Sequence, residues 1–300
     1  MSSSLDGACA LTHLGVIRVQ GEEAGRFLHS QLTQDVALLR PDQARLAAFC
    51  NAKGRMLASF VVLGAGPQEF LLVTARDLLA PTLKRLSMFV LRAKAKLTDA
   101  SSEFEVRGLM GTAASATEGL APWGKRDAGA AHLVRLYAAD ARPRALWVAP
   151  AGTQAPAASP LSLDDWLWGE VRSGIAPVTA ATTEAFVPQM LNYESVGGVN
   201  FKKGCYPGQE VVARSQFRGT LKRRAFLVHG DSALQAGAEV FHSADLGQPC
   251  GLVAQAAPAP AGGWDAIVSI QVSAAEGGQL AVNGAPVSLL ALPYPLLADI

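Results

Sequence analysis

The sequence predicts an α+β fold with antiparallel sheets, followed by a small C-terminal β-barrel or sandwich. Over residues 1–222, short strand-like runs alternate with amphipathic helical segments, a pattern typical of α+β domains. From residue 225 onward, short apolar runs alternate with turn residues, and Asn283-Gly284 is a strong hairpin signal. With 300 residues, 50% of them apolar, the chain can bury a large core across two or three structural units.

The first third of the chain is expected to contain two helices among several strands. Residues 14–19 are strand-like, and residues 22–39 carry apolar side chains at helical spacing before Pro41. A second helix should begin near Asp77, because apolar residues recur on one face and Pro81 is tolerated in a first turn. The other strand-like runs here are 45–50, 56–63 and 69–74.

The middle of the chain combines further strands with two stretches of simple composition. Residues 111–131 and 149–160 are rich in small and polar residues and are predicted to be surface connections. Ser162 followed by Asp165 resembles a capping box and predicts a helix that runs to Gly174. The strand-like runs are 103–110, 132–138 and 145–149.

Composition limits the classes of function. The formal net charge is +1, so attraction for polyanions must come from local clusters. The four cysteines form no Cys-x-x-Cys pair and have no histidine at metal-ligand spacing, so neither a disulfide framework nor a self-contained metal site is expected. The first fifteen residues lack the features of a signal peptide, and no run of eighteen apolar residues occurs. We expect a monomeric cytoplasmic protein with reduced thiols and no membrane span.

The segment at 202–210, KKGCYPGQE, places one thiol among cations and permissive glycines. Two lysines before Cys205 favour the thiolate, which is the form that attacks electrophiles or binds soft metals. Gly204, Pro207 and Gly208 predict a tight loop that presents this cysteine. The alternative is that Cys205 is a small buried apolar residue. A nucleophile, a metal ligand and a redox thiol all remain open.

Four segments, in the same order, carry a resemblance to one family. They are FLHSQLTQDV at 27–36, FCNAKGRM at 49–56, GIAPVTAATTEAFVPQMLN at 174–192 and FKKGCYPGQEVVAR at 201–214. With them the chain resembles the YgfZ family of folate-binding proteins, relatives of the glycine-cleavage T-protein. The resemblance implies an aminomethyltransferase-like fold with two intertwined α+β lobes around a central folate cavity, plus a C-terminal antiparallel β-barrel. It implies domains at 1–222, with the smaller lobe near 51–115, and at 223–300.

The resemblance also implies a folate site on the predicted helix 162–174. Helical spacing places Trp166 and Glu170 on one face, where an aromatic ring and a carboxylate suit a pterin. Without the resemblance, the simpler interpretation is that Trp166 is a core residue. The family uses a matching tryptophan for folate, so we expect tetrahydrofolate or a one-carbon derivative as ligand. The family has tryptophan where this chain has Leu14, and glutamate where it has Arg172. Leu14 can still line an apolar cavity, whereas Arg172 cannot accept hydrogen bonds.

The Cys205 loop is the second predicted site. The resemblance implies that Cys205 is a functional thiol at or near the rim of the cavity, with Lys203 favouring the thiolate and Gln209 and Glu210 orienting the loop. The other motif residues expected at this site are Gly204, Tyr206, Gly208 and Arg214. The thiol could ligate iron transiently, accept a one-carbon unit or protect a partner's cluster.

The resemblance implies a tetrahydrofolate-binding accessory protein that supports iron-sulfur cluster assembly or repair, including in tRNA-modifying enzymes. Its expected partners are folate and iron-sulfur proteins or assembly factors. T-proteins carry an aspartate pair where this chain has Ala58 and Ser59, so glycine-cleavage aminomethyl transfer is not expected. The alternative is a folate-dependent one-carbon transferase with another acceptor.

Two basic clusters, at 84–96 and 202–224, are the strongest local concentrations of charge. Either could attract a polyglutamyl folate tail, a nucleic acid or an acidic protein, or could simply be a solvated face. Aromatic residues between the cations are sparse, so direct nucleic acid binding is not expected.

Overall fold

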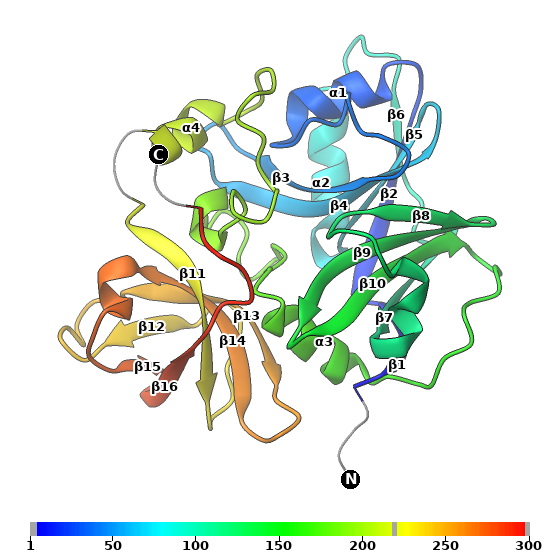
Figure 1. Cartoon of the computed structure of the whole chain (residues 1–300). Coiled ribbons are helices and arrows are strands. Elements are labelled where there is room, and N and C mark those ends of the chain that lie inside the picture. The colour runs from blue at the N-terminus through cyan, green and yellow to red at the C-terminus, as the bar shows by residue number, and fades with distance from the viewer. Residues whose placement is uncertain (1–4, 218–220, 298–300) are drawn as a thin grey trace.

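The computed structural model describes residues 5–217 and 221–297, and consists of two five-stranded sheets beside a closed β-barrel (Figure 1). All of the paired strands within the two sheets and the barrel are antiparallel. The predicted α+β class, with a C-terminal barrel, is therefore confirmed.

The first sheet has the strand order β3-β4-β5-β2-β6 and separates two hydrophobic layers. On one face it packs against both α1 and α2, through residues that include Phe27, Leu79 and Phe60. The opposite face, which includes Val16 and Val73, packs toward the second sheet. The elements are β2 (Leu14–Gln20), α1 (Ala24–Gln31), β3 (Ala44–Cys50), β4 (Met56–Gly66), β5 (Glu69–Ala75), α2 (Arg76–Ser87) and β6 (Lys96–Asp99).

The second sheet has the order β1-β7-β10-β9-β8 and intertwines with the first. Its edge strand β1 precedes the whole first sheet in sequence, yet pairs with β7, so the chain leaves this sheet and returns to it. The elements are β1 (Gly7–Ala10), β7 (Phe104–Met110), the 3₁₀ helix η1 (Gly111–Thr117), β8 (Lys125–Ala128), β9 (Ala131–Ala139) and β10 (Arg142–Pro150).

Helix α3 (Leu163–Arg172) joins the sheets to the barrel. The Ser162 hydroxyl accepts a hydrogen bond from the Asp165 amide at 3.0 Å, which confirms the predicted cap. Gly174 ends the helix at φ +70, where a side chain would meet Tyr294. The following chain contains the 3₁₀ helix η2 (Pro188–Leu191) and α4 (Gln209–Phe217).

The barrel has the closed order β11-β14-β13-β12-β15-β16. Asn283 (φ 51) and Gly284 (φ 79) form the predicted two-residue turn between its last strands, because this turn needs positive φ at both positions. The elements are β11 (Arg223–Gly230), β12 (Glu239–His242), β13 (Gly251–Pro258), β14 (Trp264–Gln271), the 3₁₀ helix η3 (Val272–Ala275), β15 (Leu280–Val282) and β16 (Ala285–Leu290).

Three local predictions were wrong or incomplete. The helix expected at 22–39 ends at Gln31, because Leu32 then bridges to Phe49 and the Thr33 amide donates to the Ala48 carbonyl at 3.0 Å. The connection expected at 111–131 contains η1 and β8, although most of its residues are small or polar. Strands β1 and β6 and helix α4 had no prediction. No helix in the described part of the chain is long and apolar enough to cross a membrane.

Candidate functional site

A cavity of about 90 Å³ lies between the two sheets and is also bordered by Glu170 of α3 and by Tyr193. Its walls are mostly apolar, with Leu46 and Val73 from the first sheet and Leu136 and Leu146 from the second. A buried water needs roughly 10–15 Å³ by the same measure, so the cavity has room for several waters or for part of a planar ring. The polar side chains that border it are therefore the groups that would orient a ligand.

Arg144, near the start of β10, is the most unusual of these polar groups. Its side chain is 2% exposed, and neither Nε nor Nη2 has a hydrogen-bond partner in the described part of the chain. Nη2 lies 4.0 Å from Glu170 Oε1, which is too far for a hydrogen bond. Burial lowers the pKa of Arg144 to about 10, so the guanidinium stays charged at neutral pH. A buried cation with unused donors favours a ligand that brings an acceptor.

Trp166 lies directly behind Arg144 and Glu170. Its ring is 0% exposed, packs against Gly108 and lies with its centroid 4.2 Å from the Arg144 guanidinium. Its Nε1 donates to Glu170 Oε1 at 3.1 Å, so the predicted shared helical face of Trp166 and Glu170 is correct. The ring has no exposed surface and does not border the cavity in this structure. Trp166 therefore supports the cavity from behind, and its direct contact with a ligand stays a prediction.

Glu170 borders the cavity and connects it to the barrel. Its second oxygen, Oε2, accepts a hydrogen bond from Gln255 Nε2 at 2.9 Å, and Gln255 belongs to β13. Leu14 also borders the cavity, as the sequence predicted. Arg172 does not: it donates to Asp140 at 2.7 Å and lies 3.6 Å from Asp265. Arg172 thus links α3 to the β9–β10 turn and the barrel rather than opposing Glu170.

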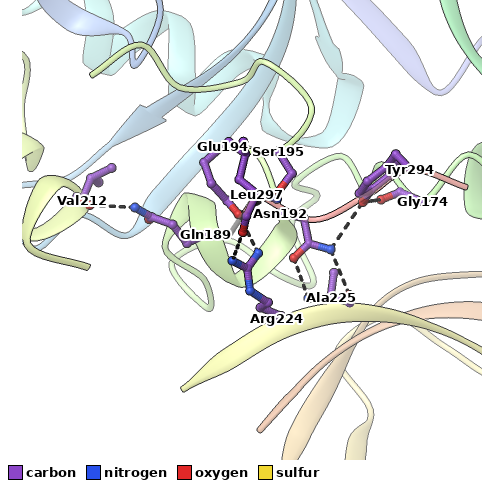
Figure 2. A network of polar contacts seen from close by, with 10 residues as sticks. All are labelled: Gly174, Gln189, Asn192, Glu194, Ser195, Val212, Arg224, Ala225, Tyr294 and Leu297. Carbon is purple, nitrogen blue, oxygen red and sulfur yellow. Dashed lines mark hydrogen bonds and ion pairs between the residues drawn. The ribbon is translucent and has the colours of Figure 1, made fainter. Parts of the chain in front are cut away.

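One end of the cavity carries aromatic rings that the C-terminal segment supports. Tyr137 lies 6.0 Å from Trp123 and 5.8 Å from Tyr294, measured between ring centroids. Figure 2 shows Tyr294 donating to the Gly174 carbonyl and accepting from Asn192. In the same view, Arg224 donates to the Glu194 carboxylate and to the Leu297 carbonyl. The buried network therefore fastens residues 294–297 beside the cavity.

The Cys205 loop is held against α1 by Lys203. The ammonium is buried, donates to the carbonyls of His29 (2.5 Å) and Leu32 (3.0 Å), and lies 4.6 Å from the Tyr206 ring centroid. Lys203 thus satisfies carbonyls at the C-terminal end of α1. Burial lowers the pKa of Lys203 to about 8, while Asp35 and Cys205 act in the opposite direction. Its predicted effect on the Cys205 thiolate stays a prediction.

Cys205 itself is exposed, whereas the other three cysteines are buried. Burial raises the pKa of Cys50 to about 12 and also raises the pKa of Cys9 and Cys250. Gly208, at φ +81, cannot be replaced without strain, because a Cβ there would lie 2.4 Å from the Asn51 carbonyl oxygen. The tight turn predicted at Gly208 is therefore correct, whereas Gly204 does not adopt a positive φ. Cys205 is the accessible thiol among the four.

The remaining motif residues define the start of α4. Gln209 and Glu210 begin this helix, and Glu210 pairs with Arg214 at 2.7 Å on its exposed surface. Gly204 is exposed beside the His29 ring, and Tyr206 is buried. None of residues 201–217 borders the cavity. The structure therefore does not place Cys205 in the cavity wall. Arg218, from the predicted basic cluster, lies outside the described residues.

Comparison with known proteins shows the family and the fold of this chain. A family model described as the GCVT N-terminal domain matches residues 6–132. The glycine cleavage system aminomethyltransferase T of Bartonella henselae superposes with a TM-score of 0.69, covering 96% of this chain and 86% of that chain. Its 17% identity limits the likeness to the fold. The aminomethyltransferase-like architecture expected from the sequence is thereby confirmed.

Closer relatives carry the name tRNA-modifying protein YgfZ. The protein of Edwardsiella ictaluri is 32% identical over 234 residues, which cover 72% of this chain and 69% of that protein. This chain belongs to the YgfZ family. The YgfZ protein of Colwellia psychrerythraea is 30% identical over 233 residues, covering 73% and 70% of the two chains.

In this YgfZ-family chain the structure separates the predicted site residues into two groups. Leu14 and Glu170 border the cavity with Trp166 behind them, and the motif residues from Lys203 to Arg214 lie around α1 and α4. Sequence reasoning missed Arg144 and Gln255. The sequence feature that could have indicated Arg144 is a charge directly before the apolar run ALWVA at 145–149. No sequence feature indicates Gln255, because its partner Glu170 is 85 residues away. In the described part of the chain, no group of three His, Cys, Asp or Glu side chains could hold a metal ion.

Proposed function

We propose that this protein binds tetrahydrofolate, or a one-carbon derivative of it, in the cavity between the two sheets. We further propose that it serves in the cytoplasm as an accessory protein for iron-sulfur cluster assembly or repair, including in enzymes that modify tRNA. The membership in the YgfZ family, whose members named above are called tRNA-modifying proteins, and the match to the GCVT N-terminal domain support this assignment.

The observation that carries the folate assignment is the buried Arg144 beside the partly buried Glu170. A pterin ring offers N–H donors and a carbonyl acceptor along its polar edge. Glu170 can accept from such donors, and the unpaired Arg144 nitrogens supply the donors that a carbonyl needs. The apolar walls would cover the faces of the ring. The residues present therefore fit the group, with Trp166 holding both polar side chains in place.

The scarcity of carboxylates at the cavity favours an accessory role over aminomethyl transfer. In the described part of the chain, Glu170 is the only carboxylate that borders the cavity, and each of its oxygens already accepts a hydrogen bond. Ala58 is buried, and Ser59, which borders the cavity, accepts a hydrogen bond from the Val178 amide. A hydroxyl in that position is a poor general acid or base at neutral pH.

The thiol would act outside the cavity, toward a partner. Cys205 is exposed on a loop that Lys203 fastens to the end of α1, so it can meet an iron-sulfur protein without entering the ligand site.

Two measurements test the proposal. Anaerobic calorimetric titration of the purified protein with tetrahydrofolate should give one binding site. Glu170→Gln, which keeps the shape of the side chain but removes its charge, should bind at least tenfold more weakly. If the wild-type protein shows no binding, the folate assignment is wrong.

The second measurement is made in bacterial cells that lack their own YgfZ protein. The wild-type chain should restore the tRNA nucleosides that iron-sulfur enzymes install, and Cys205→Ser should not, at equal protein level. Cys250→Ser, in which a buried thiol is changed, is the matched control and should restore them. Full restoration by Cys205→Ser would remove the thiol from the mechanism.

A further inference from the structure

The end of α2 and the turn that follows it expose large apolar side chains among cations. Leu91 is 88% exposed, more than any other large apolar residue in the described part of the chain, and Met88 and Phe89 are 58% and 43% exposed. In Figure 1 the turn between α2 and β6 rises at the top of the view, at the opposite end of the molecule from the barrel. We call residues 84–92 the α2 tip. An exposed apolar group of this kind marks a place where a soluble protein meets a partner or a membrane.

The α2 tip is a projection and not the wall of a groove. Side chains of consecutive helical residues point about 100° apart, so a helix end whose neighbours in sequence are exposed is free of contacts on most sides. Leu86 is buried, but the two residues before it and the three residues after it are exposed. No residue of the tip borders the cavity between the sheets.

The core and the backbone do not account for the exposed leucine. The chain around it is fixed, because Val90 packs on the core beside α2 and the Lys94 amide donates to the Glu23 carboxylate at 2.8 Å. Leu91 itself has φ +33, and asparagine or glycine adopts positive φ more easily than leucine does. Its side chain therefore contributes little to the fold and is available for an external contact.

The charges around the apolar side chains are mostly uncompensated. Residues 84–96 contain five cations and no carboxylate. Lys94 pairs with Glu22 at 2.9 Å. The other four side chains form no ion pair with the described residues: Lys84, Arg85, Arg92 and Lys96. Met88 continues the helical conformation (φ −66, ψ −22), so Lys84 lies one helical turn before it on the same face. Cations and apolar groups thus occupy one surface.

This combination favours a partner that is anionic outside, apolar inside and able to deform around a projection. A leaflet with anionic lipids has these properties, since its phosphates attract the cations and its acyl chains accept the apolar side chains. A nucleic acid would use the cations but would gain little from Leu91 and Met88. A second copy of this chain would bring the same cations against them. A folded acidic protein would need a hollow shaped to the tip, whereas a leaflet needs none.

We propose that the α2 tip binds the surface of a membrane that contains anionic lipids, with Leu91, Met88 and Phe89 entering the leaflet and the cations lying at the level of the phosphates. The contact is peripheral and reversible, because three side chains and a few charges hold a protein far less tightly than a spanning helix does. It is separate from the folate assignment, because α2 packs on the face of the first sheet opposite the cavity.

The test is co-sedimentation of the full chain with lipid vesicles at low ionic strength. Vesicles of phosphatidylcholine and phosphatidylglycerol in equal parts should bind the wild type at least about tenfold more tightly than vesicles of phosphatidylcholine alone, and added salt should weaken the binding. Arg85→Gln combined with Arg92→Gln should remove most of this preference for anionic vesicles.

A single apolar substitution tests whether the tip enters the leaflet. Leu91→Asn removes the most exposed apolar side chain and suits the positive φ, so it should keep the stability of the wild type in urea and bind anionic vesicles about tenfold more weakly. Leu246→Asn changes a leucine that is 71% exposed between β12 and β13 of the barrel. It is the matched control and should bind as the wild type does.

Three results would overturn the inference. If the wild type binds neither kind of vesicle, the tip is not a membrane site, and an acidic protein becomes the better candidate for its partner. If Leu91→Asn binds as tightly as the wild type, or Leu246→Asn loses as much affinity, the contact is not at the tip. If the wild type binds a single-stranded RNA oligonucleotide more tightly than the anionic vesicles, and only the arginine variant weakens that binding, the tip is a nucleic acid site. The titration with tetrahydrofolate tests the folate function separately.

Discussion

Replacing Arg144 with methionine tests whether this residue serves to bind a ligand or to stabilise the fold. The substitution removes the charge and keeps an unbranched apolar side chain beside Trp166. Burial lowers the pKa of Arg144 from 12.5 to about 10. At about 1.4 kcal/mol for each pKa unit, holding the charge costs the free protein about 3 kcal/mol.

The ring of Trp166 offsets part of this cost, because a desolvated cation over a tryptophan ring contributes about 2 kcal/mol. The attraction of Glu170 at 4.0 Å is already included in the lowered pKa. The net contribution of the charge is therefore small, and Arg144→Met should change the free energy of unfolding by less than about 2 kcal/mol in urea denaturation. Tetrahydrofolate should bind about ten- to a hundredfold more weakly, because one hydrogen bond to a charged group is lost.

The opposite result would refute this reasoning. If Arg144 were instead a structural ion-pair partner of Glu170, its removal should cost about 3–5 kcal/mol, because the carboxylate would lose its counter-charge. A loss of stability of that size, with folate affinity unchanged, would make Arg144 a structural residue. Arg172→Met is the matched control: it breaks the contacts to Asp140 and Asp265, so it should lower stability and leave folate affinity unchanged.

Two further predictions concern the loop and the core. Because burial holds the pKa of Lys203 near 8, below its ordinary 10.5, the unfolded chain binds more protons than the folded one between these values. Lys203 therefore makes the free energy of unfolding rise with pH above about 8. The difference between the wild type and Lys203→Met in urea-denaturation free energy, measured against pH, should show this rise. Parallel pH profiles of the two proteins would contradict it. Gly108→Ala should destabilise the protein by about 2 kcal/mol, because the new Cβ would lie 2.4 Å from the fully buried Trp166 ring. Gly64→Ala, with open space around its Cβ, is the control, and equal stability of the two variants in urea would show that the Trp166 pocket can yield.

Local sequence features were enough to predict those parts of the structure that depend only on neighbouring residues. The cap at Ser162 needs only Asp165 three residues later, and the turn at Asn283-Gly284 needs only two residues that tolerate positive φ. The exposure of Cys205 followed from the same kind of reasoning, because Gly208, at φ +81, provides the turn that follows the thiol. Apolar periodicity likewise located most of the strands of both sheets.

Contacts between distant segments decided what periodicity could not. The apolar spacing of residues 22–39 continues past Gln31, but a hydrogen bond from Thr33 to Ala48 makes the chain leave the helix. Strand β8 forms in a segment of weak strand preference, because β9 offers it a partner.

The sequence by itself determined the family, the fold class, the capped helix with Trp166 and Glu170 on one face, and the displayed thiol. Only the tertiary structure decided that Arg144 is buried beside Glu170, that Gln255 reaches Glu170 from the barrel, and that Lys203 binds the carbonyls at the end of α1. The reason is that a side-chain pattern reports which face of an element is buried, whereas the cost of a buried charge depends on partners that the fold brings from far along the chain.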